Sequence, residues 1–125
     1  MLFNSVQNFS QNFVSDILDG MYDWVRVIDR DKNIILMNKA MCEGLGKCQI
    51  GKKCYELIGR TEPCEICISR DAVFDGKSHE KQEIINGRIF SVMSSPVKNK
   101  NNEIVAVVEV LRDVTHIHIL HNKIM

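Results

Sequence analysis

Apolar and polar residues alternate in two parts of the chain, and this alternation predicts β-strands. Alternation over four to eight residues is typical of strands that bury one face. The predicted strands are Trp24–Ile28, Ile34–Asn38, His79–Ile85, Arg88–Val97 and Ile104–Leu111.

Polar turns separate these strands. Asp29–Asn33 predicts the turn of a first hairpin, because Asp and Asn side chains bond their own backbone, and Asn33 tolerates a left-handed conformation better than most residues. Asn86–Gly87 predicts a second hairpin, since Asn-Gly between extended runs is a strong hairpin signal. The polar segment 98–102 precedes the last strand.

Both ends of the chain show helical spacing instead. Phe9, Phe13, Ile17 and Leu18 form the apolar stripe of an amphipathic helix that ends near Gly20, and Ile117, Leu120 and Ile124 repeat the pattern in the tail. Between the two groups of strands, short helical patterns interrupted by several glycines predict short helices joined by turns, of which the longest is Glu65–Phe74 with a stop at Gly76. The expected fold is α+β: a five-stranded antiparallel sheet with short helices on one face and an amphipathic N-terminal helix.

Composition narrows the class of protein. The chain has 125 residues, the size of one domain, and its 16 basic residues balance 16 acidic ones without long runs of one sign. This balance gives no reason to expect direct binding of nucleic acid or of a membrane surface. Residues 1–20 lack the pattern of a signal peptide, and no apolar run approaches bilayer length, so we expect a cytoplasmic protein.

The five cysteines are the main candidates for chemistry. Cys54, Cys64 and Cys67 follow a C-x9-C-x2-C spacing, and a C-x2-C pair lets two thiolates reach one zinc ion or iron–sulfur cluster, with Cys48 or Cys42 as a fourth ligand. Two other interpretations stay open. A Cys64–Cys67 or Cys54-linked disulfide would make a redox sensor, and reduced thiols would act as small hydrophobic side chains.

Four local sequences carry a family resemblance. They are Trp24–Asp31, Met37–Ala40, Phe90–Val97 and Arg112–Thr115, and their order and spacing resemble the PAS domain family from about Val14 to Thr115. Lys32 and Asn102 stand where the family often has turn glycines, and Ala106 replaces a frequent glycine. Asn102 is an easy substitute because Asn visits the left-handed region, whereas Lys32 suggests a different type of turn.

The resemblance implies a sensory input domain without catalytic activity. A pocket would bind an unknown small molecule, and Asp113 and Thr115 would relay its state to a C-terminal effector: a histidine kinase of a two-component system, a diguanylate cyclase or a transcription activator. The expected organisation is a dimerisation helix at 1–20, a sensor domain at 21–115 and a linker helix from 116–125. The alternative is a C-x-x-C thiol redox enzyme or a small metal-binding protein.

The resemblance leaves the pocket undefined. Haem and flavin are not expected, since the small-helix region holds no histidine and Cys54 lacks the surroundings of a flavin photoadduct site. The sheet residues expected to face inward are Val25, Val27, Ile35, Met37, Val92, Val108 and Val110, or their neighbours one position along. Glu109, Arg112 and His79 are the polar exceptions, with a solvent-facing position as the simplest expectation.

The tail holds three further histidines, His116, His118 and His121. They offer at most a two-nitrogen metal site in either a strand or a helix, so we expect a polar face on a linker helix. A pH-responsive linker is the alternative, because histidine titrates near neutrality.

Overall fold

The structure is a computed structural model, and it describes residues 11–58, 61–62 and 67–117. Five strands form one sheet: β1 (Trp24–Asp29), β2 (Ile34–Met37), β3 (His79–Ile85), β4 (Arg88–Lys98) and β5 (Ile104–Asp113). The helices are α2 (Gln11–Asp19), α3 (Lys39–Leu45), the 3-10 turn η1 (Glu56–Ile58) and α4 (Ile68–Asp75). No helix in the described ranges is both long and apolar enough to cross a membrane.

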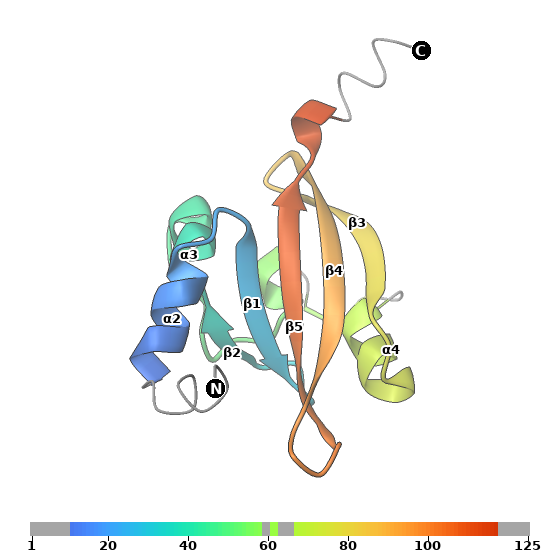
Figure 1. Ribbon diagram of the computed structural model, residues 1–125. Coiled ribbons are helices and arrows are strands. Elements are labelled where there is room, and N and C mark those ends of the chain that lie inside the picture. The colour runs from blue at the N-terminus through green and yellow to red at the C-terminus, as the bar shows by residue number, and fades with distance from the viewer. Residues whose placement is uncertain (1–10, 59–60, 63–66, 118–125) are drawn as a thin grey trace.

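The sheet is antiparallel throughout, in the order β2-β1-β5-β4-β3 (Figure 1). The last strand therefore lies in the centre, where β5 pairs with β1 on one side and with β4 on the other. The five predicted strands and the antiparallel class are confirmed. The second strand ends one residue earlier than predicted, because Asn38 leaves the sheet to begin α3.

The two predicted hairpin turns form, with one difference in backbone conformation. Asp29 Oδ1 accepts bonds from the amides of Asp31 and Asn33, as expected for an Asp that closes its own turn. The left-handed residue is Lys32, with φ 69°, rather than Asn33. Lys32 thus adopts the backbone conformation that a glycine usually adopts.

The longest of the central helices begins later than predicted. Cys67 is the N-cap of α4, and the helix continues to Asp75, where Gly76 ends it with φ 72°. Gly76 has the predicted role, since a left-handed glycine is the usual residue after a helix. The predicted start at Glu65 lies outside the described residues.

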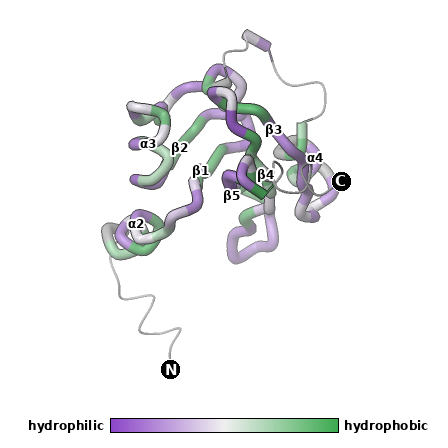
Figure 2. Tube along the Cα trace, turned by 90° about the horizontal axis from the view of Figure 1, so that it is seen from above, coloured by the Kyte–Doolittle hydropathy of each residue, from purple (hydrophilic) through white to green (hydrophobic). Residues whose placement is uncertain are grey.

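The core lies between one face of the sheet and the short helices. Met41 of α3, Leu57 of η1 and Ile68 of α4 pack against the same cluster of inward-facing strand residues. Figure 2 shows α3 and α4 at opposite ends of the sheet. The strand residues of this cluster are Trp24, Ile28, Ile34, Met37, Ile85, Phe90, Val92 and Leu111.

This cluster decides between the two sets of inward-facing residues that the sequence left open. Met37 and Val92 face the core as predicted, but in β1 and β5 the face is formed by the neighbours one residue along, such as Ile28 and Leu111. Ile35 is exposed. The strand period of two fixes which residues share a face but not which face is buried, so a shift of one residue exchanges the whole set.

Asn38 attaches the N-terminal helix to the rest of the domain. Its side chain is completely buried and accepts bonds from the amides of Val25 and Met41, while Nδ2 donates to the carbonyls of Leu18 and Asp23. One side chain therefore joins α2, the linker after it, β1 and the start of α3. Every donor and acceptor atom of the amide is used, as burial of a polar group requires.

Candidate functional site

A small cavity lies between the inner face of the sheet and the segments around η1 and α4. Its volume is about 30 Å³, which is space for roughly two water molecules. Its apolar wall includes Ile68, Ile85, Val92 and Leu111, together with Tyr55 and two cysteines. Its polar wall carries four charged side chains: Arg26, Lys81, Glu83 and Glu109.

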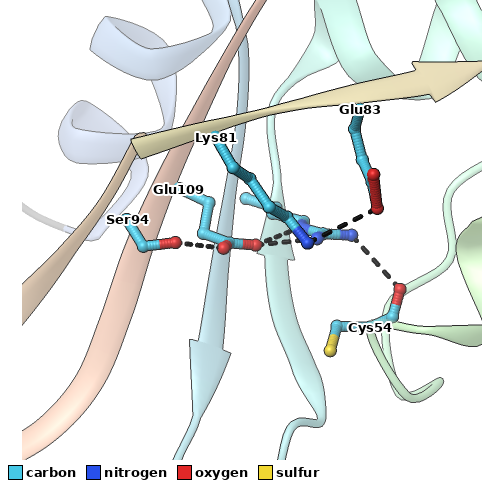
Figure 3. Close-up of polar contacts among 6 residues, drawn as sticks. Cys54, Lys81, Glu83, Ser94 and Glu109 are labelled. Atoms are coloured by element: carbon cyan, nitrogen blue, oxygen red, sulfur yellow. Dashed lines mark hydrogen bonds and ion pairs between the residues drawn. The ribbon is translucent and has the colours of Figure 1, made fainter. Parts of the chain in front are cut away.

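Strand register brings Arg26, Glu109 and Ser94 together. Arg26 of β1 lies opposite Glu109 of β5, and Glu109 lies opposite Ser94 of β4, so the three form one row across the sheet. Arg26 Nε and Nη2 lie 2.8 and 2.7 Å from Glu109 Oε1, and Ser94 donates to Oε2. Figure 3 shows the hydroxyl of Ser94 directed at the carboxylate of Glu109.

The ion pair between Arg26 and Glu109 is buried, and a buried ion pair is uncommon in a protein core. Glu109 is 3% exposed and Arg26 is 9% exposed. Removing two such charges from water costs several kcal/mol each, and mutual attraction repays that cost only where further hydrogen bonds complete the pair. Ser94 supplies one such bond, and the carbonyl of Cys54 accepts another from Arg26 Nη1 at 3.4 Å. A buried charged cluster beside a cavity is a common property of functional sites.

A second ion pair lies on β3 beside the first. Lys81 Nζ is 3.4 Å from Glu83 Oε1, and both side chains are mostly buried (Figure 3). Within the described residues, this Glu83 oxygen is buried and makes no hydrogen bond, and the Lys81 ammonium is its ion-pair partner. A buried carboxylate oxygen normally has a donor, so Glu83 offers an open acceptor at the cavity.

Two of the three predicted metal ligands lie at this cavity. Cys54 and Cys67 are both buried in its wall, whereas Cys64 lies outside the described residues. Burial raises the pKa of the Cys54 thiol, which keeps it protonated and poorly nucleophilic. In the part of the chain that the structure describes, no three His, Cys, Asp or Glu side chains form a metal-binding group. The complete three-cysteine site stays a prediction.

The two remaining cysteines have a different arrangement from the one expected. Cys42 of α3 and Cys48 of the following loop form a disulfide, with 4.6 Å between their Cα atoms. Neither sulfur is therefore free to be the fourth metal ligand in this state. Only the separation of six residues along the chain pointed to this pairing, and the predicted disulfides involved other cysteines.

The predicted relay residues are attached to the start of β4. Asp113 Oδ1 accepts a bond from the Thr115 amide, and Asp113 also forms an ion pair with Arg88. Thr115 Oγ1 accepts from the Ile89 amide, and the Val114 amide donates to the Ile89 carbonyl. The Arg88 bond is the main reason that the pKa of Asp113 is lowered to about 2. A helical turn begins directly at Thr115.

The three polar exceptions of the strands occupy different environments. Glu109 is buried, so the expectation that it faces solvent was wrong. Arg112 is exposed and pairs with Asp23, in the linker before β1, at 2.9 Å. His79 is half-buried, with Nε2 2.7 Å from Asp75 Oδ2. Arg26 was not predicted as a site residue. The signal that could have revealed it is a charged residue between two valines in a predicted strand.

The tail histidines are only partly described. His116 is exposed, which agrees with the expected polar face, while His118 and His121 lie outside the described residues.

Comparison with known proteins identifies the family. A family model for the PAS domain matches residues 20–116, and the chain therefore belongs to the PAS domain family. Curated protein sequences give no match.

Solved structures of similar fold include PAS domains and a sensor kinase. A PAS domain from Colwellia psychrerythraea is 21% identical with a TM-score of 0.67, covering 84% of this chain and 97% of that one. The PAS domain of nitrogen regulation protein NR(II) from Vibrio parahaemolyticus is 17% identical, with a TM-score of 0.62 and coverages of 84% and 99%. A sensory box sensor histidine kinase from Vibrio cholerae is 19% identical, with a TM-score of 0.57, covering 92% of this chain and 97% of that one. At these identities the likeness concerns the fold.

Proposed function

We propose that this chain is a sensory input domain that binds a small polar molecule in the cavity beside Arg26 and Glu109 and regulates an effector. The observation that carries the proposal is the ring of four charged side chains around a cavity in the core. A domain of this size has enough apolar surface for a core without buried ion pairs. Pairs of this kind seldom add net stability, so a ligand-binding role explains their presence better.

The cavity restricts the chemistry of the ligand. Two cations and two anions line it, so its formal charge is balanced and a neutral or zwitterionic molecule fits better than a net ion. The open oxygen of Glu83 calls for a hydrogen-bond donor on the ligand. A volume of about 30 Å³ admits only a few non-hydrogen atoms in the present conformation. The proposed ligand is thus a small molecule with at least one N–H or O–H group.

Two probes of equal size test this chemistry. Formamide and acetonitrile each have three non-hydrogen atoms, but only formamide donates hydrogen bonds. At about 50 mM, above the millimolar affinities open to so small a molecule, formamide should shift the amide NMR signals of Cys54 and Glu83 and acetonitrile should not. Glu83→Met should abolish the effect, and Glu80→Met on the exposed face of the same strand should preserve it. Equal shifts from both probes, or none from formamide, would contradict the proposal.

The proposed output runs through the end of β5. Glu109 of the cavity and Asp113 of the relay lie on the same strand, and Thr115 begins the helical turn of residues 115–117 (Figure 1). A ligand that favours one packing of β5 against β4 would bias this turn by a population shift. The effector is proposed to be a histidine kinase, a diguanylate cyclase or a transcription activator; the similar sensor histidine kinase from Vibrio cholerae supports the first of these.

The partner proposed for this domain is a second copy of the chain, with α2 at the interface. Phe13, Val14 and Ile17 of α2 are all exposed, although they form the apolar stripe of the helix. An exposed apolar stripe is typical of a helix that meets another subunit. Light scattering at tens of micromolar should report a dimer, and Ile17→Asp should produce a monomer with an unchanged far-UV spectrum. A wild-type monomer at that concentration would contradict this part.

A further inference from the structure

The Cys42–Cys48 disulfide lies outside the cavity, but the loop that follows it leads directly there. Cys48 is exposed and Cys42 is half-buried against the core cluster. The disulfide closes a short loop, residues 42–48, at the end of α3. Of its two sulfurs, a solvent-borne thiol reaches that of Cys48 more readily.

Residues 49–54 lead from Cys48 to the cavity wall, and their backbone amides donate hydrogen bonds to β2 and to the turn before it. The Gln49 amide donates to the sulfur of Met37 at 3.2 Å, and the Gly51 amide donates to the Ile34 carbonyl at 2.7 Å. The Cys54 amide donates to the Lys32 carbonyl at 2.9 Å. The segment therefore lies along the outer edge of β2, held by bonds at its middle and end and by the disulfide at its start.

The last residue of this segment belongs to the charged cluster. The Cys54 carbonyl accepts from Arg26, and Arg26 binds Glu109. A change in the position of residues 49–54 therefore alters one hydrogen bond of the buried ion pair. The disulfide thus fixes the start of a segment whose end forms part of the cavity.

The single tryptophan of the chain lies against the same disulfide-closed loop. A Cβ atom added to Gly44 would come within 2.3 Å of the Trp24 ring, so the ring lies directly on the backbone of α3 at Gly44. Trp24 also stacks with Phe90, at 4.5 Å between ring centroids. Loosening of the loop 42–48 therefore changes the environment of the only indole.

We propose that Cys42–Cys48 is a redox-active disulfide whose co-substrate is a low-molecular-weight thiol or a dithiol protein, and that its reduction releases residues 49–54 from β2. A thiolate attacks Cys48 Sγ, the S–S bond breaks, and Cys42 leaves as a thiolate that takes a proton from solvent. A second thiol attacks the mixed disulfide and releases Cys48 as a thiol. In sum, the protein gains two thiol hydrogens and two thiols become one disulfide. This inference holds whether or not a ligand binds in the cavity.

The test compares the oxidised and reduced full chain by thiol labelling and amide hydrogen exchange. In air-purified protein, N-ethylmaleimide should leave Cys42 and Cys48 unmodified; after dithiothreitol both should react under native conditions, while buried Cys54 reacts slowly. Reduction should speed exchange of residues 49–54, by up to roughly 50-fold from the closure entropy of so short a loop, and should shift Trp24 fluorescence.

Two variants complete the test: one removes the disulfide, and the other is a matched control that keeps it. Cys48→Ser should show the fast exchange before any reductant and no further response, whereas Lys47→Ala should respond as the wild-type chain does. Three results would overturn the proposal: labelling of both cysteines before reduction, complete reduction with unchanged exchange in 49–54, or a remaining response in Cys48→Ser.

Discussion

Arg26 and Glu109 face each other on the neighbouring strands β1 and β5, with 2.7 Å between Nη2 and Oε1 and both side chains buried. Glu109→Gln should lower the free energy of unfolding by about 3–5 kcal/mol, because it leaves the guanidinium buried without a counter-charge. Arg26→Met combined with Glu109→Leu should recover most of this loss, since neither charge then remains. Urea unfolding of the single and double variants measures both values.

A matched control for this prediction is the exposed pair Arg112–Asp23. Arg112→Met removes the same kind of contact from the surface, where solvent screens it, and should cost less than about 1 kcal/mol. Equal losses from Arg112→Met and Glu109→Gln would show that burial of the Arg26–Glu109 pair does not matter.

Asn38→Ala should destabilise the domain and release its N-terminal helix. The substitution leaves buried partners of the amide unpaired and removes the N-cap of α3, so a loss of about 3 kcal/mol or more is expected. Amide exchange in α2 should rise more than exchange in β4. Lys39→Ala is the control, because it removes an exposed side chain and keeps the hydrogen bond from the Lys39 backbone amide to Asp19 Oδ1. Unchanged exchange in α2 would contradict the role given to Asn38.

Asp113 should remain ionised at unusually low pH. Its folded-state pKa is lowered from 3.8 to about 2, so its contribution to stability is complete above pH 4 and is lost as the pH falls through about 2. Solvent screening keeps that contribution small, since the pair with Arg88 is partly exposed. The carboxyl NMR signal of Asp113 should still report the ionised form at pH 3. Arg88→Gln should move the pKa back toward 3.8, whereas Lys100→Gln should not.

Gly44→Ala should be destabilising although alanine favours helices. The added Cβ would lie 2.3 Å from the Trp24 ring, and the ring cannot move freely because it also stacks on Phe90. Overpacking of this kind costs about 1–3 kcal/mol. Thermal unfolding should show a lowered midpoint, with Glu43→Ala, one residue earlier on α3, as the neutral control. A raised midpoint would mean that the ring is not held at Gly44.

The sequence predicted the five strands but not the charged site between them. Strand bounds followed from alternation and from turn residues such as Asn86–Gly87, because these signals act over a few neighbouring residues. Glu109 lies between two valines in β5, and a charged residue in such a strand is usually solvent-facing. Its burial depends on Arg26, which is 83 residues away, and a single sequence does not reveal such a pair.

The cysteines show the same division between local and distant information. The C-x9-C-x2-C spacing directed attention to Cys54 and Cys67, and the structure places both at the cavity. The disulfide was missed because Cys42 is in a helix and Cys48 is in the loop after it, so their proximity depends on how the chain turns at Gly46. Spacing alone does not specify the direction of that turn.

The contact between Arg112 and Asp23 also has a mechanical consequence. Asp23 lies where the chain enters the sheet and Arg112 lies where it leaves, so one surface ion pair joins the entrance to the exit. An exposed ion pair of this kind contributes at most about 1 kcal/mol to stability, which is close to thermal energy. A conformational change that repositions either Asp23 or Arg112 therefore meets little resistance from this contact.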